Sequence, residues 1–339
     1  MSADNRPIVI ATRGSALALT QTHAILEACK AAFPSVQFEI KILKTTGDKL
    51  QTVPATAPNQ PASKGLFTKE LEVALLNGEA DLAVHSLKDL PTDLPEGLAL
   101  AAVTKREDVR DVLIYRDAEF FGRTAEGQRV KSGLKPHATL LDFAPGSTIA
   151  TGSTRRQAQI LAARPDLKLV PVRGNVGTRL RKLADRAEYD GLVLAAAGLN
   201  RLQVRLQSDG RMKAGQKAGG PTVVPDGLLA SYLSLEEMLP CVGQGAIGIE
   251  TRAGDAKIAA ICERLNDPET QACVTAERAF LQWMGGGCLS PVAALAQIID
   301  GGLRLKAVSF RDGIARRGES SGTPADAAAI GGKLARELK

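Results

Sequence analysis

The feature that most constrains the fold is a unit that recurs along the chain: a short apolar run, a turn, and a helix-forming segment. The first copy begins with the apolar residues 8–10, and Ser15 is a good N-cap for a helix that Pro34 ends. Alternating apolar residues at 38–42 then predict a second strand. Because strands and helices alternate in this way, we predict an α/β fold.

The same unit places polar side chains where strands end. The strand expected at 81–84 leads into Lys88 and Asp89, and Pro91 cannot continue a central strand. We therefore expect Lys88 and Asp89 on the turn at the carboxyl end of that strand. In open α/β sheets this edge is the one at which ligands bind.

Three later copies of the unit, with strands near 149, 167–172 and 192–195, end just before a series of arginines. Arginine offers fixed donor forks that match carboxylates, so a series of them at one sheet edge predicts a ligand with several carboxylates. The alternative is a set of solvated surface arginines and helix caps. The formal net charge of +6 is too small to name a partner by itself.

Other stretches depart from this unit. Residues 51–63 carry three prolines and no charge, which predicts a loop. Residues 116–147 are polar, basic and irregular, and we interpret them as an insertion; 208–226 are interpreted as a second loop. The last part of the chain predicts a small α/β domain with a helix, two strands and a final alanine-rich helix, at 269–284, 292–296, 303–310 and beyond.

Length and composition exclude several classes of protein. A chain of 339 residues favours two or three domains, and 44% hydrophobic and 24% charged residues are typical of globular proteins. No apolar run reaches the roughly 20 residues of a membrane span, and the N-terminus lacks a signal-peptide pattern, so we expect a cytoplasmic protein. An aromatic content of 4% offers few platforms for stacking nucleic-acid bases.

The cysteines limit the redox and metal chemistry. Their number, five, is odd and no CxxC pair occurs, which argues against a disulfide framework or a zinc site. Any special cysteine should therefore act alone. Cys288 follows three glycines, which permit tight turning and close approach of a ligand, so its thiol could be reactive. The alternative is a small buried residue that leads into a strand.

Asp89 is the candidate for acid–base chemistry. A carboxylate beside Lys88 could act as a general acid or stabilise a carbocation, or it could only cap the turn before a proline. The sequence shows no Ser/His/Asp grouping for hydrolysis and no Walker loop. The Gly-x-Gly at 243–245 lacks the rest of a dinucleotide-binding motif.

Eight motifs, in this order, resemble the porphobilinogen deaminase (hydroxymethylbilane synthase) family and cover nearly the whole chain. They are ATRGSALALTQ (11–21), KGLFTKELE (64–72), AVHSLKDLP (83–91), TGSTRRQAQ (151–159), RGNVGTRL (173–180), AAAGLNRL (195–202), VGQGAIGIE (242–250) and AERAFLQWMGGGC (276–288). The resemblance implies an α/β fold of three domains. Domains 1 and 2 would resemble the two lobes of a type-2 periplasmic binding protein, and domain 3 would be a small α/β domain that carries the cofactor cysteine. The implied boundaries are 1–110 plus 242–264, 111–241, and 265–339.

The resemblance also implies a transferase of tetrapyrrole biosynthesis. Cys288 would carry a dipyrromethane cofactor through a thioether bond. Four porphobilinogen molecules would join this primer with loss of ammonia, and hydrolysis would free hydroxymethylbilane. Asp89 matches the catalytic aspartate of the family, which is expected to stabilise cationic intermediates and assist proton transfer. The implied enzyme is a cytoplasmic monomer that binds no metal, nucleic acid or membrane and hands hydroxymethylbilane to uroporphyrinogen-III synthase.

Further residues match family positions that contact cofactor or substrate. Besides Cys288, the positions that match the cofactor site are Ser15, Lys88, Ser153, Arg155, Arg156, Arg173 and Gln244. The positions that match the substrate site are Arg13, Gln21, Phe67, Arg173, Arg179 and Arg201. Each pyrrole ring bears an acetate and a propionate, so a chain of rings brings many carboxylates into one cleft. Unpaired buried carboxylates would be costly, and the arginine series supplies their partners.

Two other functions remain open at this point. The chain could be a non-catalytic two-lobed anion-binding protein, which would need no reactive cysteine. It could also bind nucleic acid through the basic segment 122–139, although this segment lacks interleaved aromatic residues and any recognised motif.

Overall fold

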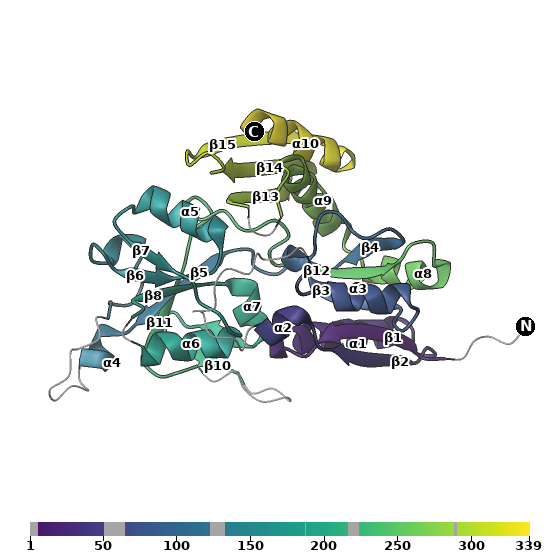
Figure 1. Cartoon of the computed structure of the whole chain (residues 1–339), viewed down its shortest axis with the longest axis horizontal. Coiled ribbons are helices and arrows are strands. Elements are labelled where there is room, and N and C mark those ends of the chain that lie inside the picture. The colour runs from purple at the N-terminus through teal and green to yellow at the C-terminus, as the bar shows by residue number, and fades with distance from the viewer. Residues whose placement is uncertain (1–5, 51–64, 123–132, 187, 216–223, 288–289) are drawn as a thin grey trace, which may run out of the picture.

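The computed structural model describes residues 6–50, 65–122, 133–186, 188–215, 224–287 and 290–339. Its strands form two five-stranded sheets, a three-stranded sheet and a two-stranded ribbon. Helices pack on the three larger sheets, which confirms the predicted α/β fold with two lobes and a small third unit. The two large sheets lie side by side, and the three-stranded sheet lies above them in the view of Figure 1.

The first sheet has the strand order β2-β1-β3-β12-β4. Its strands are β1 (Ile8–Arg13), β2 (Phe38–Leu43), β3 (Leu82–Ser86), β4 (Leu98–Val103) and β12 (Ile247–Arg252). Strand β1 is parallel to β2 and β3, whereas β12 is antiparallel to β3 and β4. Because side chains alternate along a strand, Ile10 packs with α1 (Ala16–Ala32) and α8 (Ala256–Leu265), and Ala11 packs with α3 (Lys69–Leu76) on the other face.

The second sheet has the strand order β11-β5-β8-β6-β7. Its strands are β5 (Asp111–Arg116), β6 (Thr148–Ala150), β7 (Lys168–Val170), β8 (Gly191–Ala195) and β11 (Leu228–Tyr232). Strand β6 is parallel to β7 and β8, whereas β5 is antiparallel to β8 and β11. Helix α6 (Val176–Asp185) packs against one face through Leu180, and α5 (Thr154–Ala163) packs against the other through Ile160. Helix α7 (Ala196–Arg201) follows β8.

Two segments of chain join the large sheets. The chain passes from β4 to β5 and returns between β11 and β12. Strand β12 lies between β3 and β4 in the first sheet, although it follows every strand of the second sheet in sequence. The residues at which the three predicted domains begin and end remain a prediction.

The third sheet is an antiparallel meander of β13 (Val292–Ile299), β14 (Gly302–Ser309) and β15 (Arg316–Gly322). Helices α9 (Pro268–Trp283) and α10 (Ala327–Leu338) pack on it, with Phe280, Leu305 and Leu334 in the shared core. The sequence pattern predicts only the first two of these strands. Strand β15 reads RRGESSG and buries only Ser320, so it lacks the apolar alternation that marks a strand.

The prediction for 116–147 was wrong in part. Arg116 is a fully buried residue of β5 and donates hydrogen bonds to the carbonyl oxygens of Leu183 and Tyr189. Leu140 and Phe143 pack into the core of the second sheet. A polar, irregular sequence therefore includes residues that pack into the second lobe. Residues 123–132 of this stretch lie outside the described part of the chain.

The stretch 208–226 is likewise not all loop, because β10 (Met212–Ala214) pairs with β9 (Val204–Leu206). The loop predicted at 51–63 lies outside the described residues. The remaining elements are α2 (Thr46–Leu50), α4 (Ala118–Gly122) and the 3-10 helices Leu87–Asp89, Leu140–Asp142 and Pro324–Asp326. Among the described helices, none has the length and apolar character needed to cross a membrane.

Candidate active site

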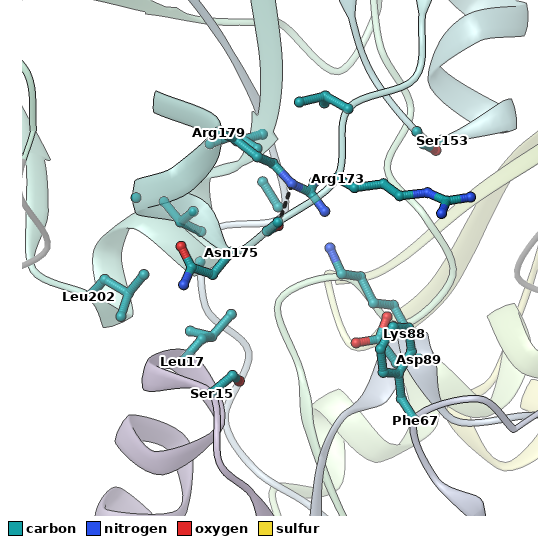
Figure 2. Close-up of a pocket in the computed structure, with 18 of the residues that line it drawn as sticks. Ser15, Leu17, Phe67, Lys88, Asp89, Ser153, Arg173, Asn175, Arg179 and Leu202 are labelled. Carbon is teal, nitrogen blue, oxygen red and sulfur yellow. Dashed lines mark hydrogen bonds between the residues drawn. The ribbon is translucent and has the colours of Figure 1, made fainter. Parts of the chain in front are cut away.

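A cavity of about 940 Å³ is lined by residues from the facing edges of the two large sheets. The first sheet and its helices contribute Arg13, Ser15, Leu17, Phe67, Lys88 and Asp89. The second sheet contributes Ser153, Arg155, Arg156, Arg173, Asn175, Arg179 and Leu202. Figure 2 shows Lys88 and Asp89 on one side of this space, with Arg173 and Arg179 on the opposite side.

The end of β1 positions a cation beside an aromatic ring. Ser15 caps α1 by accepting a hydrogen bond from the Ala18 amide at 3.3 Å, which fixes the turn after Arg13. The Arg13 guanidinium lies 4.1 Å from the centre of the Phe67 ring and donates hydrogen bonds to the Asp48 carboxylate. Burial opposes ionisation of Asp48, but the hydrogen bonds from Arg13 and Thr45 outweigh it and lower the pKa of this carboxyl.

The end of β3 positions Lys88 and Asp89. The chain turns there in the 3-10 helix Leu87–Asp89. Leu87, which is 1% exposed, anchors this turn, and its backbone amide donates to the Ala246 carbonyl oxygen. Burial lowers the pKa of the Lys88 ammonium, and the charge of Asp89 beside it acts in the opposite direction. The Asp89 carboxylate and the desolvated Lys88 ammonium thus lie next to each other in the turn that follows β3.

The first turn of α5 holds two buried arginines. Ser153 caps this helix by accepting from the Arg156 amide, so Arg155 and Arg156 lie in its first turn, just beyond the end of β6. Their side chains are only 4% and 8% exposed. Both donate to the Asp111 carboxylate, with Nη1 of Arg155 and Nη2 of Arg156 each 2.7 Å from an oxygen. Burial opposes ionisation of Asp111, but the two guanidinium charges outweigh it and lower the pKa of this carboxyl.

The loop between β7 and α6 presents two further arginines. Gly174, at φ +114°, turns the chain there, and Asn175 caps α6 by accepting from the Thr178 amide at 2.9 Å. Arg179 donates from Nε to the Gly174 carbonyl oxygen at 2.7 Å, and burial lowers its pKa (Figure 2). Arg173 is exposed, and within the described chain its side chain has no hydrogen bond or ion pair.

The cavity gathers most of the predicted residues, but two of the described ones, Gln21 and Arg201, do not line it. Gln21 lines a smaller cavity of about 60 Å³, which also touches Asp89, and exchanges hydrogen bonds with Ser86 at 3.0 and 3.1 Å. Arg201 lines neither cavity and donates to the Gly245 carbonyl oxygen at 2.6 Å. Cys288 lies outside the described residues.

Three further residues were not predicted from the sequence. Asn175 and Cys241 line the cavity, and burial raises the pKa of the Cys241 thiol. Asp111 supports two of the lining arginines. A signal for Asp111 exists in the sequence, because a carboxylate opens the otherwise apolar run DVLIY and must find a buried partner there.

The arrangement suits a ligand with several negative charges and a reaction that moves a proton. Among the described lining residues, several arginines and Lys88 accompany one carboxylate, Asp89. Two buried polar atoms of lining residues, Nε of Arg155 and Oε1 of Gln244, have no partner within the described structure. In that same part of the chain, no cluster of three or more His, Cys, Asp or Glu side chains could hold a metal ion.

Comparison with known families gives two matches that together span most of the chain. The model "Porphobilinogen deaminase, dipyromethane cofactor binding domain" matches residues 8–260. The model "Porphobilinogen deaminase, C-terminal domain" matches residues 271–339.

Curated relatives agree with these matches. "Porphobilinogen deaminase" of Thermus thermophilus is 42% identical over 336 residues, which covers 98% of this chain and 95% of the relative. The protein of the same name from Geobacillus kaustophilus is 42% identical over 303 residues, which covers 89% of this chain and 84% of the relative. Among solved structures, the effector-binding domain of BenM with benzoate has a TM-score of 0.40 at 14% identity, covering 76% of this chain and 90% of that one. That overlap is too loose to bear on fold or function.

Proposed function

The chain belongs to the porphobilinogen deaminase family, and from this premise we propose that it is a transferase that condenses four porphobilinogen molecules head to tail. Ammonia leaves at each addition, the growing chain is built on a dipyrromethane primer joined to Cys288, and hydrolysis frees hydroxymethylbilane. The match of both family models along the chain carries this proposal. The cationic cavity supports it, because the substrate and primer are polycarboxylates.

The cavity residues fit a dipyrromethane group. Buried polar atoms without partners, such as Nε of Arg155 and Oε1 of Gln244, are costly unless a ligand or water satisfies them. When bound, the group supplies the free α-carbon to which each new ring is added. The side chains that would hold it are Ser15, Lys88, Ser153, Arg155, Arg156, Arg173 and Gln244.

The substrate contacts follow from the same charges. Arg13 and Arg179 would bind porphobilinogen carboxylates, and Phe67 would lie against the ring, since Arg13 already stacks on Phe67. Gln21 would act from the smaller cavity beside Asp89. Arg201 would contact the substrate beside the segment between β11 and β12, where its guanidinium donates a hydrogen bond to the Gly245 carbonyl oxygen.

Asp89 is the proposed catalytic residue. Its carboxylate lines both cavities and lies next to Lys88. A negative charge at that point would stabilise the cation that forms as ammonia leaves porphobilinogen, and the same carboxylate could hold a proton for the departing amine. The arginines opposite would meanwhile hold the substrate carboxylates and orient the ring.

The proposal also includes the domain boundaries, the cellular location, the oligomeric state and the transfer of the product. The domains would be 1–110 plus 242–264, 111–241 and 265–339, with the cofactor cysteine on the third. The enzyme would be a cytoplasmic monomer that hands hydroxymethylbilane to uroporphyrinogen-III synthase. The strand membership of the three larger sheets supports the domain boundaries.

Denaturing mass spectrometry of protein from a porphobilinogen-producing host tests the proposal. We expect a mass that exceeds the sequence by two pyrrole units, and we expect Cys288→Ser to abolish the excess. Cys241→Ser is the matched control, because it removes another thiol, one that lines the cavity, and should keep the excess. An unmodified wild-type mass would favour the non-catalytic anion-binding protein instead.

A further inference from the structure

One carboxylate organises three side chains that line the cavity. Asp111 is the first residue of β5 and is fully buried. Its Oδ2 accepts from Nη1 of Arg155 at 2.7 Å, and its Oδ1 accepts from Nη2 and Nε of Arg156 at 2.7 and 3.2 Å. Oδ1 also accepts from Nε2 of Gln244 at 3.0 Å. Asp111 itself is not among the lining residues, so it acts behind the surface that a ligand would meet.

Backbone carbonyl groups complete the orientation of these side chains. Arg155 also donates from Nη1 to the Leu239 oxygen at 2.7 Å, and Arg156 donates from Nη1 to the Val193 oxygen at 2.8 Å. Each guanidinium is therefore held at more than one point. A planar group held in this way keeps one direction toward a ligand before the ligand arrives, which reduces the entropy lost on binding.

Charge explains why a carboxylate is needed at this point. Arg155 and Arg156 are adjacent in sequence and almost fully buried, so their charges repel each other in a poorly solvated place. Asp111 offsets one of the two charges, and the pair keeps a net positive charge for one ligand carboxylate. The two guanidinium groups in turn lower the pKa of Asp111, so it stays ionised at neutral pH.

The same carboxylate joins both segments that connect the large sheets. Asp111 ends the outgoing segment, and Gln244 belongs to the returning one. Nε2 of Gln244 donates both to Asp111 and to the Val109 carbonyl oxygen, at 3.0 and 2.8 Å. The orientation of the two arginines is therefore tied to the place where one lobe meets the other.

We infer that Asp111 is a positioning residue, which fixes Arg155, Arg156 and Gln244 to receive a carboxylate of the pyrrole chain and ties them to the junction of the two lobes. This inference rests on the proposed function. It predicts that altering Asp111 weakens primer loading and substrate binding even where the fold survives.

The test compares Asp111→Asn with Asp190→Asn. Asp190 is a partly buried carboxylate of the same lobe that accepts from Nη2 of Arg116 at 3.4 Å and from the Thr148 amide at 2.8 Å, and it lines no part of the cavity. Each protein is produced without porphobilinogen, then mixed with porphobilinogen, and the two-pyrrole mass gain is followed in time. Asp111→Asn should load at least tenfold more slowly and, once loaded, show a KM raised at least tenfold with a smaller change in kcat. Asp190→Asn should melt at a lower temperature but load at the wild-type rate.

Asp111→Glu separates position from charge. It keeps the negative charge but moves the carboxylate by one methylene, so a role limited to neutralising charge predicts wild-type loading. We expect loading slower than wild type and faster than Asp111→Asn. If Asp111→Asn does not fold, Asp111→Glu carries the comparison, and if neither folds, Asp111 is only a folding determinant and the inference is overturned.

The failures of the inference and of the proposed function are distinguishable. Wild-type protein that never gains two pyrrole units would overturn the function. Wild-type protein that loads, together with Asp111 variants that load and bind at the wild-type rate and KM, would overturn the inference alone. Equal loading defects in Asp190→Asn would also overturn it, because the defect would then follow stability.

Discussion

Two arginine-bearing segments of the second lobe stand at the same sheet edge but are built differently. The first turn of α5 carries Arg155 and Arg156, which are buried and bonded to Asp111. The loop between β7 and α6 carries Arg173, which is exposed, and Arg179, which is held only by the nearby Gly174 carbonyl oxygen among the side-chain bonds that are described. Both segments follow parallel strands, so strand topology alone does not set how firmly a cation is held.

The difference suits a ligand of which one part stays in place and another part grows. A primer that remains attached throughout the reaction needs contacts of constant geometry, which the fixed pair on α5 offers. A lengthening polycarboxylate needs cations that can change partners. Arg173 offers such a cation, because its side chain is exposed and bonds to none of the described residues. Under the proposed function, the second lobe therefore combines a rigid and an adjustable anion site.

The largest expected effect separates the two segments directly. Arg155→Leu should lower the free energy of unfolding by about 3 kcal/mol, because it removes a buried partner of Asp111, and should abolish primer loading. Arg173→Leu should change stability by less than about 0.5 kcal/mol, because the residue is exposed, yet should slow elongation. Urea unfolding and denaturing mass spectrometry measure the two quantities. Equal stability losses in both variants would remove the distinction between fixed and adjustable cations.

A smaller effect should appear in the pH dependence of stability. The folded pKa of Asp111 is lowered, so the carboxyl stabilises the folded state above its unfolded pKa, and this contribution is lost as pH falls from about 5 toward the folded pKa. The stability difference between wild type and Asp111→Asn should therefore shrink on acidification, by about 1.2 kcal/mol between pH 6 and pH 3. The difference between wild type and Arg173→Leu should stay constant over that range. Urea unfolding at each pH measures both, and a constant Asp111→Asn difference would contradict the buried charge pair.

Local patterns in the sequence were enough to predict the elements that frame the cavity. Ser15 caps α1 as predicted, and Lys88 and Asp89 lie on the turn after β3. The arginines of α5 and of the β7–α6 loop lie at strand ends as predicted. These features depend on a few neighbouring residues, so they can be recognised without the rest of the fold.

Long-range partners could not be predicted in the same way. Asp111 and Arg155 are 44 positions apart in sequence, and nothing local joins them. Arg201 matches a substrate position of the family, yet its guanidinium holds the Gly245 carbonyl oxygen across 44 positions. Strand β15 depends on pairing with β14 rather than on its own polar sequence. In each case a contact with a distant part of the chain, rather than the propensity of the local segment, decides where the side chain binds or whether the strand forms.

The smallest expected effect tests whether the adjustable segment depends on its helix cap. Asn175→Ala removes the side chain that accepts from the Thr178 amide, which should cost about 1 kcal/mol and loosen the first turn of α6, where Arg179 lies. We expect the KM for porphobilinogen to rise about threefold, within the roughly fivefold that 1 kcal/mol allows. Asp267→Ala is the matched control, because Asp267 caps α9 with the same 2.9 Å bond to a threonine amide but lies outside the cavity. It should lower stability by a similar amount and leave KM unchanged, so a rise in KM for both variants would show that general loosening, rather than the position of Arg179, weakens substrate binding.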